Sequence, residues 1–140
     1  PNTMNMTVTN VDLGSILVDG NASQMRDDVL VFGGAGTMPA GTILARDSVS
    51  LKLVAYVDGG STNENGIPKT VLTRDVTATG AGDVQVRVPQ ECTVREERLI
   101  INASVTAAAT TITKLHVDQL RAYGVKVVSV TELAKLDNQA

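Results

Sequence analysis

The chain has very few aromatic side chains. Of its 140 residues only Phe32, Tyr56 and Tyr123 are aromatic, and there is no tryptophan. Sugar rings and nucleic-acid bases are bound largely by stacking on such side chains, so the chain has few residues with which to bind either ligand in this way. The core has to be built from Val, Leu, Ile and Ala, which make up most of the hydrophobic 43% of the sequence.

Cysteine and histidine each occur once, as Cys92 and His116. A disulfide within the chain is therefore impossible, and a zinc site would need carboxylates at metal-ligand spacing, which the sequence does not show. A cysteine–histidine nucleophile pair would require the two residues to meet, with a third group orienting the imidazole ring. A lone histidine in a partly apolar helix is more often packed or solvated, so we expect no metal and no catalytic residue.

Positive charge and long apolar runs are also scarce. Twelve Lys and Arg stand against 15 Asp and Glu, which gives a net charge of -3 and a pI of about 5.0. Nucleic-acid binding would lack its usual electrostatic term, so we expect no nucleic-acid partner. No apolar run approaches the ~20 residues of a membrane span, and the first residues lack the order of a signal peptide. We therefore expect no membrane partner and synthesis in the cytoplasm.

The motifs for phosphate binding and acid–base catalysis are incomplete. Gly33, Gly34 and Gly36 could present backbone N–H groups to a phosphate, but Pro39 stands where a dinucleotide fingerprint needs a third small residue. This phosphate-binding motif also needs a helix after the glycine turn, but the segment "TILARD" that follows predicts a strand. Carboxylates are plentiful, yet nothing in the sequence holds two of them in a cleft in different environments. We expect no cofactor and no enzymatic activity.

Residues 1–28 differ from the rest of the chain and predict an extended arm. They contain no Lys or Arg before Arg26 and are rich in Asn, Thr and Ser. Apolar and polar residues alternate from Met4 to Thr9, the period-2 pattern of a strand with one apolar face. Such a strand can pair inside its own domain or add to a neighbouring subunit's sheet, and the period does not distinguish the two. The predicted contact surface of the arm comprises Met4, Met6, Thr7, Val8, Val11, Leu13, Ile16 and Leu17.

Residues 29–131 predict a mainly β (α+β) domain, which a short tail at 132–140 follows. Apolar or alternating runs between glycine-rich turns predict strands at 29–32, 42–45, 48–57, 69–78, 83–88, 99–101 and 125–130. In the run 48–57, we expect Leu51, Leu53, Ala55 and Val57 to share one face.

Two polar segments and one helix complete the prediction. The stretch "DGGSTNENGIPK" predicts a long surface loop at 58–69, and "REER" predicts a solvated turn at 95–98. A helix is predicted at 111–123, with Thr110 or Thr111 as its cap. Its apolar face would be formed by Ile112, Leu115 and Leu120 or Tyr123, and Gly124 can take the left-handed conformation that ends a helix.

Three stretches share their order and spacing with a known family. They are "AGTMPAGTILARDSVSLKLVAYV", "GIPKTVLTRDVTATGAGDVQVRV" and "LHVDQLRAYGVKVV". In this order they resemble the head decoration, or capsid cement, proteins of tailed bacteriophages of the lambda type. The resemblance covers about residues 28–130. The polar "GGSTNENG" insertion and the C-terminal helix depart from the shortest family members, so details of their trimer contacts cannot be transferred.

The resemblance implies a small β-clip-like domain without catalytic residues. It further implies a homotrimer on the outer surface of the virion, at the three-fold axes of the expanded capsid. There the arm would contact the major capsid protein of the same phage, and the trimer would stabilise the shell against the pressure of packaged DNA. An extended chain reaches ~3.3 Å per residue, so an arm of this length can cross tens of ångströms to a neighbouring subunit.

Two other functions are compatible with the sequence. The chain could be a virion-associated binding module that recognises a host surface glycan or protein through the loop at 58–69, although few aromatic residues are available for glycan stacking. It could also be a small enzyme that uses Cys92 and His116, for which the sequence offers no further support.

Overall fold

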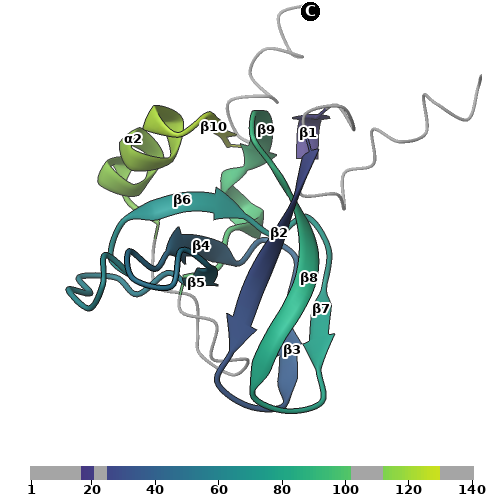
Figure 1. The fold of residues 1–140 in the computed structure, drawn as a ribbon. Helices are drawn as coiled ribbons and strands as arrows, with labels where there is room; N and C mark the ends of the chain where they lie inside the picture. Colours follow the sequence, from purple (N-terminus) through teal and green to yellow (C-terminus); the bar gives the residue numbers. More distant parts are fainter. Residues whose placement is uncertain (1–16, 21–24, 102–111, 130–140) are drawn as a thin grey trace, which may run out of the picture.

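The computed structural model describes residues 17–20, 25–101 and 112–129 (Figure 1). The first of its sheets has the strand order β1 (Leu17–Gly20), β9 (Cys92–Arg95), β10 (Val125–Val128). The second has the order β6 (Pro68–Val71), β4 (Ile43–Arg46), β5 (Leu53–Ala55), β2 (Met25–Phe32), β8 (Gly82–Pro89). A small sheet pairs β3 (Gly36–Met38) with β7 (Val76–Ala78). The helical elements of the described residues are the 3-10 turn η2 (Glu96–Arg98) and the α-helix α2 (Lys114–Ala122). The predicted mainly β fold with a helix near the C-terminus is confirmed.

The longest ladder joins β2 and β8. The two strands pair antiparallel over eight residues, from Met25 opposite Pro89 to Phe32 opposite Gly82, and Figure 1 shows them side by side as a two-stranded ribbon. The run predicted as a strand at 29–32 therefore begins four residues earlier. Residues 25–28, at the end of the predicted arm range, belong to this sheet.

The central strand β4 is buried on both faces. Ile43, Leu44 and Ala45 have no exposed surface at all. Because successive side chains of a strand point to opposite faces, Ile43 and Ala45 enter one hydrophobic cluster and Leu44 enters another. A short continuous apolar run is typical of such a doubly covered strand.

Each of the two clusters joins a different set of elements. The first draws on β4, β6, β9, α2 and β10, and consists of Ile43, Ala45, Tyr56, Val71, Cys92, Val94, Leu99, Ile101, Leu120 and Val125. The second lies around the β2–β8 ribbon and consists of Leu30, Phe32, Met38, Leu44, Leu53, Leu72, Ala78, Val86 and Val88. Aliphatic residues make up most of both clusters, with Tyr56 in the first and Phe32 in the second.

The predicted strand at 48–57 is wrong in length, because a turn occupies its first part. The Asp47 carboxylate accepts the backbone N–H groups of Val49 and Ser50 at 2.8 and 2.9 Å. Leu51 follows in the left-handed region at φ 64° and is exposed, so it does not share a buried face with Leu53. Only Leu53–Ala55 form β5.

The prediction that Val57 shares a face with Leu53 is also wrong, because Tyr56 is the buried residue at this end of the segment 48–57. The Tyr56 side chain is buried in the first cluster, and its backbone N–H donates to the carbonyl of Ile43 at 3.0 Å. Val57, which was expected beside Leu53, is 40% exposed.

The prediction of one strand each at 69–78 and 99–101 is also wrong. The first divides into β6 and β7, and between them the Asp75 carboxylate accepts the N–H of Ala40 at 2.8 Å. The second forms only an isolated bridge between Ile100 and Thr42. Within the predicted solvated turn at 95–98, Arg95 is buried at the end of β9, whereas the two residues at 97–98 are exposed.

The helix prediction is confirmed in position, with a later start. Thr113 is the N-cap of α2, and Gly124 follows its end at φ 93°, the left-handed conformation expected of it. The predicted apolar face is wrong at Leu115, which is 63% exposed, because the neighbouring His116 turns inward beside Leu120.

Candidate binding surface

The arm residues predicted to make contacts are mostly outside the described part of the chain. These are Met4, Met6, Thr7, Val8, Val11, Leu13 and Ile16. Leu17 begins β1, whose backbone pairs antiparallel with β9, with Leu17 opposite Val94 and Gly20 opposite Cys92. β1 is an edge strand of its sheet. Because β1 pairs with β9, the part of the predicted arm that it forms is joined to the domain by backbone hydrogen bonds. The contact of the arm with another subunit stays a prediction.

Two exposed apolar side chains, Val49 and Leu51, form an apolar projection on the turn between β4 and β5. Val49 is 75% exposed and Leu51 is 68% exposed, which are high values for aliphatic side chains. The turn is held by the two bonds to Asp47 and by the Ser48 N–H, which donates to the carbonyl of Asn63 at 3.0 Å. The same N–H donors lower the pKa of the Asp47 carboxyl. Sequence periodicity assigned Leu51 to the core and so missed this projection.

His116 lies in a hydrogen-bonded cluster with Tyr56 and Asp58. Its Nδ1 accepts the backbone N–H of Thr113 at 3.0 Å, so Nε2 carries a proton and donates to Oδ1 of Asp58 at 3.0 Å. The Tyr56 hydroxyl donates to the same oxygen at 3.1 Å, and the Tyr56 and His116 rings meet edge to face. These donors lower the pKa of Asp58, and burial, with Asp58 nearby, raises that of Tyr56 to about 12.

The His116 cluster joins the loop after β5 to the start of α2. Both ring nitrogens of His116 are engaged by groups of the protein, so neither is available to a substrate. Burial raises the pKa of the Cys92 thiol to about 11, which keeps it protonated at neutral pH. The arrangement therefore does not support the thiol–imidazole pair considered from the sequence.

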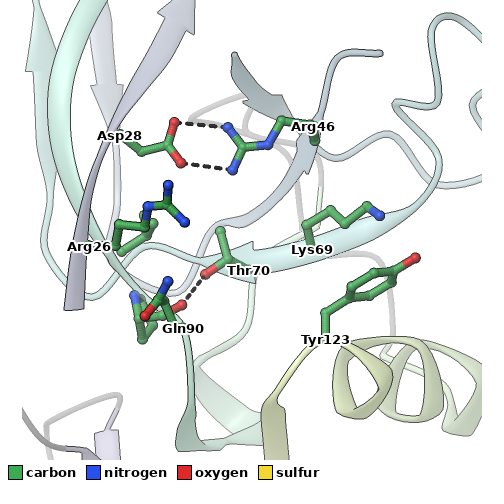
Figure 2. A pocket seen from close by; sticks show the side chains of 9 residues that line it. Arg26, Asp28, Arg46, Lys69, Thr70, Gln90 and Tyr123 are labelled. Carbon is green, nitrogen blue, oxygen red and sulfur yellow. Dashed lines mark hydrogen bonds and ion pairs between the residues drawn. The ribbon is translucent and has the colours of Figure 1, made fainter. Parts of the chain in front are cut away.

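A pocket of about 280 Å³ opens between β2, β4, β6, β8 and the end of α2 (Figure 2). It is lined by Arg26, Asp28, Arg46, Lys69, Thr70, Val88, Pro89, Gln90 and Tyr123. Arg46 donates through both terminal nitrogens to the Asp28 carboxylate, at 2.9 and 2.8 Å. Burial opposes ionisation of Asp28, but the hydrogen bonds from Arg46 and the Val29 N–H prevail and lower its pKa. None of the residues that line the pocket was predicted from the sequence to belong to a site, because they are scattered along the chain.

Neither a metal-binding cluster nor a membrane-spanning helix occurs among the residues that the structure describes. Over these ranges no three His, Cys, Asp or Glu side chains are placed to hold a metal ion. Nor does any helix among them have the length and apolar character required to cross a membrane.

The fold defines a small β-rich protein whose described residues hold an exposed apolar turn, a buried histidine cluster and a charged pocket. The family model for bacteriophage lambda head decoration protein D matches residues 5–125. The chain therefore belongs to this family, and the resemblance stated from the sequence is confirmed. A comparison with curated proteins gave no match. Membership makes the chain a structural protein of the phage head that associates with the capsid, which is not a class of enzymes.

Proposed function

We propose that the chain binds the outside of the expanded phage capsid as a homotrimer at the three-fold axes and cements the shell against internal DNA pressure. The observation that carries this proposal is the family match over residues 5–125, which includes most of the arm as well as the domain. The partners are then the major capsid protein of the same phage and two further copies of this chain.

The stabilisation follows from binding linkage. A ligand that binds only the assembled, expanded lattice stabilises it by RT ln(1 + [L]/Kd) per site, about 2.7 kcal/mol at a hundredfold excess over Kd. A trimer strengthens this effect, because its second and third arms bind at high effective concentration. Selectivity for the expanded shell requires contact surfaces that exist in that state and not before it.

The attachment of β1 supports a mechanical role for the arm. Residues 17–20 are paired with β9, and β9 is paired in parallel with β10. A pull on the preceding residues would therefore be carried by a three-stranded sheet and the first hydrophobic cluster rather than by a free linker. The alternating residues from Met4 to Val8 can supply a strand to the capsid protein's sheet, where main-chain hydrogen bonds give affinity.

Co-sedimentation with undecorated heads tests capsid binding. The full chain should sediment with expanded heads at a fixed stoichiometry and should remain in solution with unexpanded heads. Deletion of residues 2–13 should abolish this binding while far-ultraviolet circular dichroism and the urea midpoint stay close to those of the full chain. A folded deletion variant that still decorates expanded heads would refute the role assigned to the arm.

The oligomeric state is tested separately by sedimentation equilibrium of the free chain. The proposal predicts a species with three times the chain mass. A monomer at every accessible concentration would contradict a preformed trimer, and trimers would then have to form on the shell itself.

A further inference from the structure

The pocket of Figure 2 lies where the two edges of the five-stranded sheet approach one another. β6 and β8 are the outermost strands of that sheet, yet the sheet curls so that they touch. The Thr70 hydroxyl of β6 donates to the carbonyl of Pro89 in β8 at 3.0 Å. Because the contact rests on a side chain instead of a full ladder, room remains beside it for a group from outside.

The pocket carries a local excess of positive charge. Of its three cations, Arg46 is matched by the bidentate bond to Asp28 and also donates to the carbonyl of Leu51 at 3.1 Å. Arg26 and Lys69 remain, and no carboxylate other than Asp28 lines the pocket. This leaves two positive charges in a chain whose net charge is -3.

The two remaining cations lie on opposite sides of the pocket, and the Lys69 ammonium points toward the Tyr123 ring and not toward Arg26. Figure 2 shows Arg26 and Gln90 on one side, with Lys69 and Tyr123 on the other. The Lys69 ammonium lies 3.7 Å from the centroid of the Tyr123 ring. A cation–π contact of this kind holds the ammonium in position without neutralising its charge.

We propose that this pocket binds a single carboxylate group presented by an acidic peptide segment. The planar guanidinium of Arg26 matches a carboxylate in two parallel hydrogen bonds. The Gln90 amide on the same side offers a further donor, and the charge of Lys69 adds to the positive potential of the pocket. Small-molecule sites span roughly 300–1,000 Å³, so a pocket of about 280 Å³ accommodates one side chain better than a cofactor. A phosphate would bring nearly twice the negative charge of a carboxylate close to Asp28, so repulsion by Asp28 disfavours phosphate in this pocket. This inference does not depend on capsid binding.

Peptide titration of the full chain tests the proposal. Blocked tetraglutamate, added at low ionic strength and neutral pH, should shift the amide resonances of Arg26, Thr70 and Gln90 in nuclear magnetic resonance spectra, and blocked tetraglutamine should not. Arg26→Gln should weaken the binding of tetraglutamate roughly tenfold, as expected for loss of one charge-assisted pair. Arg87→Gln is the matched control, since Arg87 is an exposed arginine of β8 outside the pocket, paired with Asp27. It should leave binding unchanged.

Four results would overturn the assignment. These are the absence of peptide-induced shifts, equal binding of tetraglutamine, an equal loss in both arginine variants, and tighter binding of inorganic phosphate than of tetraglutamate. If tetraglutamate binds as expected, sedimentation of Arg26→Gln separates the sources of the acidic segment. Weaker self-association than in the parent chain assigns the carboxylate to a second copy, and unchanged self-association assigns it to a different protein.

Discussion

At the level of single residues, His116 occupies a core position on α2 that an apolar side chain would otherwise fill. It is 4% exposed, and both ring nitrogens have partners, so its burial leaves no polar atom unsatisfied. The sequence showed only that a lone histidine follows Leu115. It did not show that His116 turns inward and donates to Asp58, which lies 58 residues away in the chain.

Replacing His116 by Ala should lower the free energy of unfolding by about 2–4 kcal/mol. The change leaves a cavity, removes the acceptor for the Thr113 N–H and breaks the bond to Asp58. Leu115→Ala, at the exposed neighbouring position, should change it by no more than about 0.5 kcal/mol. Urea denaturation measures both. Equal effects of the two substitutions would show that the His116 cluster contributes nothing to stability.

The stability of the domain should fall in alkaline solution. The pKa values of Cys92 and Tyr56 are raised in the folded chain, from 9.0 to about 11 and from 10.0 to about 12. Below about pH 8 both groups are protonated in both states, so their contribution is fully present. As pH rises through 9 to 12 the unfolded chain loses its protons first, and the folded state is disfavoured by an amount on the order of 3 kcal/mol at pH 11.

Urea midpoints measured from pH 7 to 11.5 check this dependence. In Cys92→Ala the decline should begin about one pH unit higher, because only Tyr56 then contributes. A flat profile up to pH 11, or identical profiles for the two chains, would contradict the assignment of these buried groups.

At the level of elements, the sequence predicted which segments are strands better than where they end. The runs at 42–45, 83–88 and 125–130 correspond to β4, β8 and β10, because alternating or continuous apolar residues follow directly from burial. The errors lie where a side chain far from the apolar pattern intervenes. Asp47 closes a turn that removes Leu51 from its strand, and Asp75 holds Ala40 where the run 69–78 divides.

The junction of α2 and β10 depends on Gly124. This residue has φ 93°, and a Cβ at this position would collide with the carbonyl oxygen of Gln90. Gly124→Ala should therefore lower the free energy of unfolding by about 1–3 kcal/mol. Gly80→Ala is the control, since a Cβ there meets nothing within 4 Å. Thermal unfolding compares the two, and a Gly124 variant as stable as the Gly80 variant would exclude the predicted strain.

At the level of the whole molecule, the family was accessible from the sequence, whereas the pocket was not. The order and spacing of three stretches of the sequence carried the resemblance, and the family match over residues 5–125 agrees with it. Arg26, Lys69 and Tyr123 form no motif, because they come from β2, β6 and the end of α2. Only the curled sheet and the packing of α2 against β6 bring them together. The arm is the part of the proposed function that depends most on sequence pattern, since its residues up to Ile16 precede the described domain.

Scanning calorimetry of expanded, undecorated heads tests the central claim most directly. With the full chain present, the melting temperature of the shell should rise and should rise further as the free concentration increases, because the chain binds the assembled lattice and not its dissociated subunits. A shell of the same phage that melts at one temperature with or without saturating chain would contradict the account.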